Sequence, residues 1–412
     1  MARILLAWEL GRNLGHLSRL RPLACRLKAR GHVVLTAARD LGSAANALAP
    51  AAIAFVQAPI SSPSPIAAPA GGRLASYADL LLHQGWGDAP QLVGLLQAWI
   101  NLIRMFAPDA IVLDHAPTAA LAARSLAIPA AWIGTGFEIP PAATPLPPFP
   151  GMPMEAAAQA EDKALDLANR VLSAMHLREL SALTDLLADT PRWLATYPEL
   201  DHYGARPDER YVGVFDELGY GKTVEWPGRG KHRVFAYLRA QTPGYGAILK
   251  ALSSIDADVV GYAPDIPVSV AASLARPGLI LTNEPVRMDP LCDSMDVCVS
   301  YAPAGTVATT LLHGIPQLCA PLHREASLTA LRVEAMGAGL VLRGQQTPAA
   351  AETTIRNSLE SGTCTKQAKT FAERHRDSDK AAAVEAIADG MEAIAAASSR
   401  SDLPPIGRTR EK

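Results

Sequence analysis

Short apolar runs of strand length alternate with helical apolar patterns along the first half of the chain. The first run, Ile4 to Trp8, is followed by apolar residues at helical spacing up to Gly31. Two amphipathic helical patterns follow between Tyr77 and Phe106, broken near a glycine and a proline. The other strand-like runs of this half cover residues 32–37, 52–56, 108–114, 130–134, 193–197 and 211–214. This alternation predicts a parallel sheet flanked by helices.

The second half of the chain repeats the alternation. Its strand-like runs cover residues 234–238, 259–262, 279–282, 297–301 and 317–320. Before them, Glu217 to His232 is rich in glycine and charge and lacks periodicity, which is typical of a linker. We therefore predict an α/β protein with two Rossmann-like doubly wound parallel sheets.

These patterns give a predicted division of the chain. It consists of a first domain over residues 1–215, a linker over 216–232, a second domain over 233–378, a C-terminal helix over 379–397 and a disordered tail over 398–412. A segment over Ala58 to Gly72, rich in Pro, Ser and Ala, has no periodicity and is expected to be a mobile loop. Glu155 to Leu187 is expected to be helical.

Composition narrows the class of protein. A length of 412 residues is too long for one ordinary core, and a net charge of −2 argues against nucleic acid as a partner. The five cysteines are odd in number, lack CxxC spacing and lie mostly in apolar runs, as reduced core thiols do. Because no signal peptide or membrane-spanning apolar run is visible, we expect a cytoplasmic protein.

A glycine-flanked histidine directly follows the first predicted strand. Gly15 and His16 stand where the loop passes into the helix, and open α/β sheets bind ligands at this end of their strands. A helix N-terminus also offers free N–H groups to anions, which makes Gly15 a candidate donor contact. Asp114 ends another predicted strand and is therefore expected at the same sheet edge.

Several motifs, taken in order along the chain, carry a family resemblance. The first motif is similar to GHxxPxxxLAxxLxxRGHxV and consists of Gly15-His16, Leu23, Ala24, Leu27 and Arg30-Gly31-His32-Val33. The second, residues 286–296, is similar to VPxxxLLxxxD. The third is similar to a donor-binding signature and runs from Ala304-Gly305-Thr306 through Gly314-Ile315-Pro316 to Pro321, with Arg332-Val333. Together they resemble the inverting nucleotide-sugar glycosyltransferases of the GT-B fold. That family includes plant and macrolide glucosyltransferases and the peptidoglycan N-acetylglucosaminyltransferase.

The resemblance implies two Rossmann-like domains facing across a cleft, with the acceptor on the first and the nucleotide sugar on the second. It implies an inverting hexosyl transfer from a nucleoside-diphosphate sugar, which is a co-substrate, so that no separate cofactor is needed. The acceptor would be a hydroxyl of a small-molecule or lipid-linked compound. Since no Asp-x-Asp cluster or His/Cys ligand spacing stands out, we expect catalysis without a metal.

His16 suits the role of general base for such a transfer. An imidazole titrates near neutral pH, and a carboxylate on its other nitrogen fixes the tautomer and stabilises the imidazolium that forms. Asp114 is the candidate partner, and a similar aspartate pairs with the histidine in the plant relatives. The alternative is a structural loop histidine. We interpret His115 as a loop residue and His32 as a turn residue.

The donor signature departs from the family pattern at several positions. The resemblance places Tyr301 at the usual histidine, Thr309 at the ribose acid and Glu325-Ala326 at the Asp-Gln pair. A threonine cannot bind a ribose diol through two oxygens as a carboxylate can. The small residues Ala304, Gly305 and Thr306, at the start of a predicted helix, suit a diphosphate best. The full set of candidate donor contacts is Gly15, Arg239, Tyr301, Ala304, Gly305, Thr306, Thr309 and Glu325.

Some alternatives stay open at this point. The same fold would serve a nucleotide-sugar hydrolase or epimerase, and the altered donor signature would suit a non-catalytic accessory protein. Phe137 would line an acceptor pocket or anchor the core, while Arg239, His323 and Arg324 would contact the donor or lie on the surface. The first helix has a basic face that suits solvent, or else peripheral contact with an anionic membrane. Its cations are Arg19, Arg21, Arg26, Lys28 and Arg30.

Overall fold

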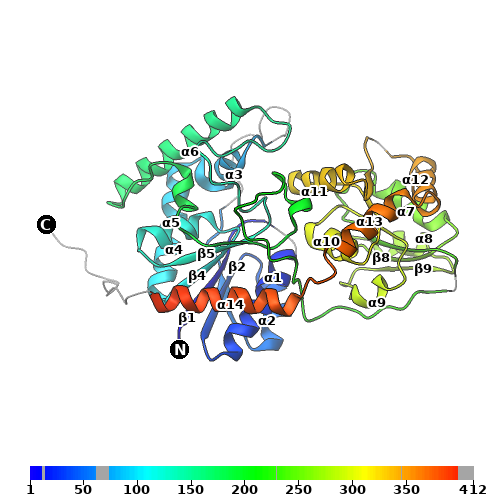
Figure 1. The fold of residues 1–412 in the computed structure, drawn as a ribbon, viewed down its shortest axis with the longest axis horizontal. Helices are drawn as coiled ribbons and strands as arrows, with labels where there is room; N and C mark the ends of the chain where they lie inside the picture. The colour runs from blue at the N-terminus through cyan, green and yellow to red at the C-terminus, as the bar shows by residue number, and fades with distance from the viewer. Residues whose placement is uncertain (12–13, 62–73, 229, 345, 398–412) are drawn as a thin grey trace. The chain divides into compact units, whose positions relative to one another are not determined.

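The computed structural model describes residues 1–397 except 12–13, 62–73, 229 and 345. These residues form two compact units (Figure 1). The first unit contains residues 1–196, 206–219 and those described from Asp379 on; the second contains 197–205 and 220–378. The predicted mobile loop lies mostly outside the described residues, and the predicted tail lies entirely outside them.

The first unit is built on a parallel sheet of six strands in the order β3-β2-β1-β4-β5-β6. The strands are β1 (Arg3–Trp8), β2 (Val33–Ala38), β3 (Ala54–Gln57), β4 (Ala110–Asp114), β5 (Ala130–Gly134) and β6 (Arg192–Leu194). The strand order reverses between β1 and β4, whose apolar residues are almost completely buried. Burial on both faces is expected for a parallel sheet that helices cover on both sides.

Helices surround this sheet. They are α1 (Gly15–Ala29), α2 (Leu41–Leu48), α3 (Tyr77–Leu81), α4 (Ala89–Phe106), α5 (Pro117–Ser125), α6 (Met154–Ala174) and α14 (Lys380–Ala397), with short helical turns η1 (Ala49–Ala51), η2 (Leu82–Trp86) and η3 (Leu183–Leu186). The predicted break between two amphipathic helices is confirmed. Gly85 adopts φ +108° there, and a Cβ on it would lie only 2.8 Å from Leu95 Cδ1.

Two predictions for this unit are wrong. The expected strand over 211–214 is an extended segment that pairs with β6 only through Tyr211 and Leu194. The expected helix over 155–187 stops at Ala174, because the chain turns at His176, which has φ +56°. A left-handed residue of this kind ends a helix.

The C-terminal helix α14 belongs to the first unit, where it packs against α1 and β4. Arg30, the C-cap residue of α1, forms ion pairs with Asp389 at 2.7 Å and Glu392 at 3.0 Å, and it also contacts Glu385. Gly390 faces Trp193 of β6, and a Cβ there would approach the indole to 2.4 Å. The predicted separate helix over 379–397 is therefore part of the first unit's structure.

The second unit repeats the same topology with its own six-stranded parallel sheet, in the order β12-β11-β10-β7-β8-β9. Its strands are β7 (Arg233–Tyr237), β8 (Asp258–Tyr262), β9 (Leu279–Thr282), β10 (Val297–Ser300), β11 (Gln317–Cys319) and β12 (Gly339–Val341). Val234 and Ala236 enter one buried cluster and Phe235 another, as alternating strand residues do. The sequence patterns missed β12, a three-residue edge strand.

The helices of the second unit fill both faces of this sheet. They are α7 (Tyr245–Ser254), α8 (Val268–Ser273), α9 (Asp289–Cys292), α10 (Ala304–Leu312), α11 (Arg324–Ala335), α12 (Pro348–Glu360) and α13 (Thr363–Arg374), with the short turn η4 (Pro198–Leu200). The turn η4 is attached to α11, since Arg332 Nε donates to the Glu199 carbonyl at 2.9 Å. The segment 197–205 thus joins the second unit, although the prediction placed it in the first domain.

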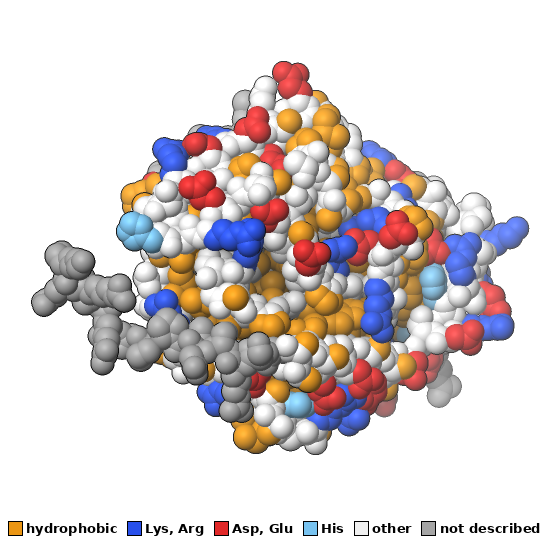
Figure 2. All heavy atoms as spheres, turned by 60° about the vertical axis from the view of Figure 1, so that its left-hand side comes forward, with side chains coloured by type: hydrophobic (Ala, Val, Ile, Leu, Met, Phe, Trp, Pro, Cys, Tyr) orange, Lys and Arg blue, Asp and Glu red, His pale blue; other side chains and the backbone are white. Residues whose placement is uncertain are grey.

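The basic face of α1 has partners within its own unit. Arg26 pairs with Glu385 at 2.7 Å, Arg21 with Glu217 at 3.1 Å, and Lys28 donates to the Ala52 carbonyl at 2.7 Å. This removes the main motive for a membrane-binding face. None of the described helices is long and apolar enough to cross a bilayer. On the face drawn in Figure 2, positive and negative side chains are interspersed. All five cysteines of the chain are free thiols.

Candidate active site

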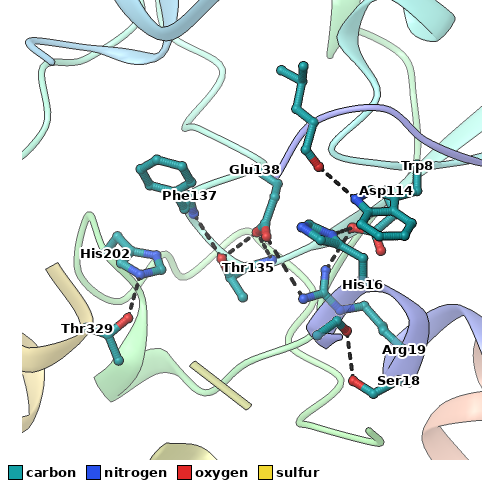
Figure 3. A network of polar contacts seen from close by, with 12 residues as sticks. Trp8, His16, Ser18, Arg19, Asp114, Thr135, Phe137, Glu138, His202 and Thr329 are labelled. Carbon is teal, nitrogen blue, oxygen red and sulfur yellow. Dashed lines mark hydrogen bonds and ion pairs between the residues drawn. The ribbon is translucent and has the colours of Figure 1, made fainter. Parts of the chain in front are cut away.

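His16 and Asp114 meet at the carboxyl edge of the first sheet. β1 and β4 are neighbouring parallel strands with Trp8 opposite Asp114, and α1 begins soon after the end of β1. The strand order reverses here, which is where open α/β sheets bind ligands. His16 Nδ1 lies 3.0 Å from Asp114 Oδ1, within hydrogen-bond distance (Figure 3). The structure therefore brings together the two residues that the sequence predicted as a pair.

Arg19, one turn further along α1, binds the same carboxylate. Its Nη1 donates to Asp114 Oδ1 at 3.0 Å, and its side chain is only 8% exposed while that of Asp114 is fully buried. The prediction that Arg19 belongs to a solvated basic face is wrong. Spacing gave a usable signal, since residues three apart on a helix lie on one face and His16 precedes Arg19 by three.

Glu138 is a fourth member of this group, which we did not predict from the sequence. It follows β5, the strand next to β4, and its Oε2 accepts a hydrogen bond from the backbone N–H of Thr135 at 2.5 Å and another from the Thr135 hydroxyl. Its Oε1 lies 4.0 Å from Arg19 Nη2. An acidic residue close behind a third neighbouring strand was the signal that could have revealed it.

The charges around His16 set its protonation. Burial alone would lower the pKa of His16, but the charge and hydrogen bond of Asp114 and the charge of Glu138 outweigh burial and raise the pKa. Burial would raise the pKa of Glu138, yet Arg19 and the two neighbouring histidines lower it to about 2. Glu138 is thus ionised at neutral pH and favours a protonated imidazole at His16.

Gly11 leaves room for the second nitrogen of His16. The Trp8 ring stacks on the imidazole at 5.2 Å between centroids, and Gly11 adopts φ +80° beside it. A Cβ built on Gly11 would lie 2.3 Å from His16 Nε2, which is well inside contact distance. Both the backbone conformation and the position of Nε2 therefore require glycine.

His115 lies next to His16 inside the unit. It has φ +49°, and its ring centroid is 6.0 Å from that of His16. Burial lowers the pKa of His115 to about 4, so the imidazole is neutral. Phe137 contacts His115 edge-on at 6.0 Å and stacks on Phe149 at 5.2 Å. With 5% exposure, Phe137 is a core residue beside the site, which favours the core alternative.

In the second unit, α10 begins at the corresponding sheet edge. β10 ends at Ser300, Ala302 adopts φ +62°, and the helix starts with Ala304, Gly305 and Thr306. Among the described residues, the N-cap Pro303 makes no capping side-chain hydrogen bond, and the first turn holds no acidic residue. A helix start of this kind presents backbone N–H groups to an anion.

Tyr301 and Arg239 lie near this helix start, and both have protein partners. Tyr301 is 1% exposed, and its hydroxyl donates to the Tyr237 hydroxyl at 3.4 Å. Arg239 donates to Asp265 at 2.6 Å from Nε, so a carboxylate already balances its charge. Both predicted residues thus follow the carboxyl ends of their strands, β7 and β10, and both are hydrogen-bonded to neighbouring side chains.

The remaining donor candidates lie on helices of the second unit. Thr309 is in the second turn of α10, where its carbonyl oxygen is 2.9 Å from His313 Nδ1. Glu325 is in the first turn of α11, after His323, whose Nδ1 accepts from the Ala326 N–H at 3.4 Å. His323 therefore acts as an N-cap for α11.

One set of residues in the first unit has the chemistry of a metal site. His16, His115 and Glu138 each offer a donor atom, and the three atoms lie within 4.8 Å of one another, all on buried residues. Sequence spacing could not reveal this set, because the three residues follow three different strands. Catalysis without a metal stays a prediction.

Comparison with known proteins identifies the family that the second unit resembles. Residues 246–388 match the family described as erythromycin biosynthesis protein CIII-like, C-terminal domain. The match spans less than half of the chain. A search of curated protein sequences finds no significant match.

Solved structures show that the whole chain has the GT-B fold. The spinosyn rhamnosyltransferase SpnG superimposes with a TM-score of 0.68 at 18% identity, covering 94% of this chain and 100% of that one. The calicheamicin glycosyltransferase CalG4 gives 0.70 at 18%, covering 95% and 98%. The Streptomyces sp. SF2575 glycosyltransferase SsfS6, complexed with thymidine diphosphate, gives 0.61 at 20%, covering 96% and 100%. The predicted fold and the resemblance to glycosyltransferases are confirmed.

Proposed function

We propose that this protein is a glycosyltransferase that moves a sugar from a nucleoside-diphosphate donor to a hydroxyl group of a small-molecule acceptor, with inversion at the anomeric carbon. The observation that carries the proposal is the buried His16–Asp114 pair at 3.0 Å, located at the strand-order reversal of a GT-B first domain. A histidine held by a carboxylate in this way is equipped for proton transfer.

The proposed mechanism begins with the tautomer of His16. Nδ1–H donates a hydrogen bond to Asp114 Oδ1, which leaves Nε2 unprotonated as the basic nitrogen. Nε2 takes the proton of the acceptor hydroxyl while its oxygen forms the new bond to the anomeric carbon. The bond from that carbon to the diphosphate breaks on the opposite face, and the nucleoside diphosphate leaves. Asp114 and Glu138 stabilise the imidazolium that remains.

The leaving diphosphate is assigned to the second unit. The uncapped N–H groups at the start of α10 would bind its charge, with Gly305 allowing close approach and Thr306 adding a hydroxyl donor. Thr309 and Glu325 are the proposed contacts to the ribose and the sugar. Arg239 and Tyr301 would have to exchange their present partners to reach a ligand, so they rank lower as donor contacts.

The compared structures support the choice of substrates. SpnG and SsfS6 were solved with thymidine diphosphate, and SpnG also with the spinosyn aglycone. By analogy we assign a thymidine-diphosphate sugar as donor and a hydroxylated small molecule as acceptor. We expect no separate cofactor and a cytoplasmic location. The fold alone does not separate transfer from hydrolysis or epimerisation, so the assay must.

The experiment is a matrix of nucleoside-diphosphate sugars and hydroxylated acceptors incubated with the full chain. Mass spectrometry identifies a product heavier by one sugar, and the anomeric coupling constant in its proton NMR spectrum reports inversion. The expected result is an acceptor-dependent product. Sugar release without acceptor would instead assign a hydrolase, and a new sugar isomer an epimerase.

A thermal-shift series with nucleoside diphosphates runs in parallel. A ligand that binds only the folded state raises the melting temperature of the protein. At a ligand concentration of about a hundred times Kd, the free energy of unfolding is expected to rise by about 2.7 kcal/mol. If no nucleoside diphosphate stabilises the protein and no donor reacts, the protein is a non-catalytic accessory protein and the proposal is wrong.

A further inference from the structure

We propose that His16, His115 and Glu138 form a binding site for a divalent transition metal of the Zn²⁺ type. The three side chains each offer one donor atom, and these atoms lie within 4.8 Å of one another. The residues are 7%, 4% and 1% exposed, so the site is enclosed by protein. Two imidazoles and one carboxylate with an open fourth position is a common set of zinc ligands.

The groups behind the ligands are already in place. Asp114 holds Nδ1 of His16 at 3.0 Å, which leaves Nε2 for the metal, and a carboxylate behind a ligating histidine is the usual outer partner in zinc sites. Thr135 fixes Glu138 Oε2 through its N–H and its hydroxyl. Two of the three ligands are therefore oriented before any metal arrives.

His115 gives an independent indication of a ligand. Its side chain is more than nine-tenths buried, and Nε2 makes no hydrogen bond within the part of the chain that the structure describes. Buried polar atoms normally have a partner, and one that lacks it points to an ion or water that completes the site. The proposed base mechanism has no use for this imidazole, whereas a metal would.

The local charge also favours a cation. Asp114 and Glu138 together outnumber the single guanidinium of Arg19 that pairs with them. Arg19 lies 3.0 Å from Asp114 but 4.0 Å from Glu138, so its tighter contact is not to the proposed ligand. Imidazole nitrogens favour Zn²⁺, Co²⁺, Ni²⁺ or Cu²⁺ over Mg²⁺ and Ca²⁺, which prefer oxygen ligands.

Metal binding and sugar transfer would exclude each other. The metal would occupy Nε2 of His16, the nitrogen that must take the acceptor proton, so the loaded protein would be inactive. This inhibitory consequence rests on the proposed function. The binding site itself does not, because it follows from the ligands alone.

The test uses the full chain, stripped with a chelator and then dialysed free of it. Co²⁺ is titrated in the absence of any substrate, and its visible d–d absorption reports coordination by nitrogen and oxygen ligands. We expect saturation at about one Co²⁺ per chain and loss of the signal when Zn²⁺ displaces it. Absence of a d–d signal, with no Zn²⁺-induced thermal shift, overturns the proposal.

Variants locate the site. Asp114→Asn removes a group behind a ligand and is expected to weaken Co²⁺ binding by roughly 10- to 100-fold. His115→Asn and Glu138→Gln each remove a ligand and are expected to weaken Co²⁺ binding more than Asp114→Asn does. His313→Gln, which changes an exposed histidine of the second unit, should bind as the unchanged protein does. Metal-free melting curves check that each variant folds. Equal Co²⁺ binding by the unchanged protein and by either ligand variant overturns the site.

The inhibition is tested separately, once a donor and acceptor are known. Zn²⁺ should abolish transfer, and His115→Asn should raise the Zn²⁺ concentration needed for half inhibition. Binding of Co²⁺ by a protein that transfers no sugar would leave the metal site standing and remove the proposed function. Sugar transfer by a protein that binds no Co²⁺ would support the proposed function and overturn the metal site.

Discussion

The two units share one sheet topology and present different kinds of site at the same place in it. In each, the strand order reverses between the first and fourth strands of the unit, β1 and β4 or β7 and β10. In the first unit this edge carries a buried network of His16, Arg19, Asp114 and Glu138. In the second unit it carries the open start of α10.

The difference follows from what each half must do. A proton can be taken only by a particular side chain of suitable pKa, so the first unit depends on residue identity. A diphosphate can be held by backbone N–H groups, which any sequence with the right conformation supplies. Under the proposed function, the altered donor signature at Tyr301, Thr309 and Ala326 would change contacts to the ribose and sugar and leave the backbone N–H groups of α10 in place.

The largest effect outside His16 is expected at Asp114. Asp114→Asn offers an amide to Nδ1 and removes the charge that stabilises the imidazolium, so the transfer rate should fall by about 10²- to 10⁴-fold. It also removes the carboxylate 3.0 Å from Arg19 while Glu138 stays at 4.0 Å, so the loss of stability should be smaller than the roughly 3–5 kcal/mol typical of a fully broken buried pair. The thermal shift produced by a nucleoside diphosphate should be unchanged. A loss of that shift in a folded variant would break the distinction between the two units.

Gly11→Ala is expected to cost about 10²-fold in rate, since the new Cβ would displace Nε2 and a misplacement near 1 Å has that effect. Gly94→Ala, on an exposed position of α4, is the control, because a Cβ there also meets nothing within 4 Å. The measurement is the initial rate of sugar transfer by each of the two variants. Equal losses would mean that the Gly11 contact has no special role.

In the second unit, Thr306→Asp should weaken nucleoside-diphosphate binding by roughly tenfold or more, because it places a negative charge beside the ligand's own. The same charge at a helix start stabilises the folded protein by about 0.3–1 kcal/mol. Calorimetric titration and melting curves should therefore move in opposite senses. Thr306→Asn is the neutral control, and unchanged binding by the Asp variant would remove α10 from the donor site.

The smallest effect is a displacement of the pH profile. Glu138 raises the pKa of His16, so Glu138→Gln lowers it, and the neutral base persists to lower pH. The acid limb of the kcat/KM profile should move to lower pH, with a modest change in the plateau. A limb that stays in place, or moves to higher pH, would mean that Glu138 does not act on the titrating group.

The sequence predicted most of the strands because buried parallel strands are continuous apolar runs. It also predicted that His16 and Asp114 would meet, since the carboxyl ends of neighbouring strands share an edge. It did not predict Arg19 in the site, because a basic residue among other basic residues on one helix is more often solvated. Glu138 and His115 joined the site through strand neighbours, which spacing along the chain does not encode.

The position of α14 was out of reach for a different reason. An alanine-rich helix has an apolar face but no feature that specifies its partner. Its acidic residues pair with Arg26 of α1 and with Arg30, the C-cap of α1, about 360 positions away in sequence, and only the folded chain shows these pairs. Likewise the sequence did not show that the Tyr301 hydroxyl donates to Tyr237, and its role as a donor contact stays a prediction.

The most direct test of the account measures sugar transfer by His16→Ala beside the unchanged protein, with one donor, one acceptor and saturating substrates. If His16 takes the acceptor proton, the rate should fall by about 10²- to 10⁴-fold. The nucleoside-diphosphate thermal shift should persist, because the proposed donor site lies in the second unit. A His16→Ala rate within twofold of the unchanged protein would contradict the central claim.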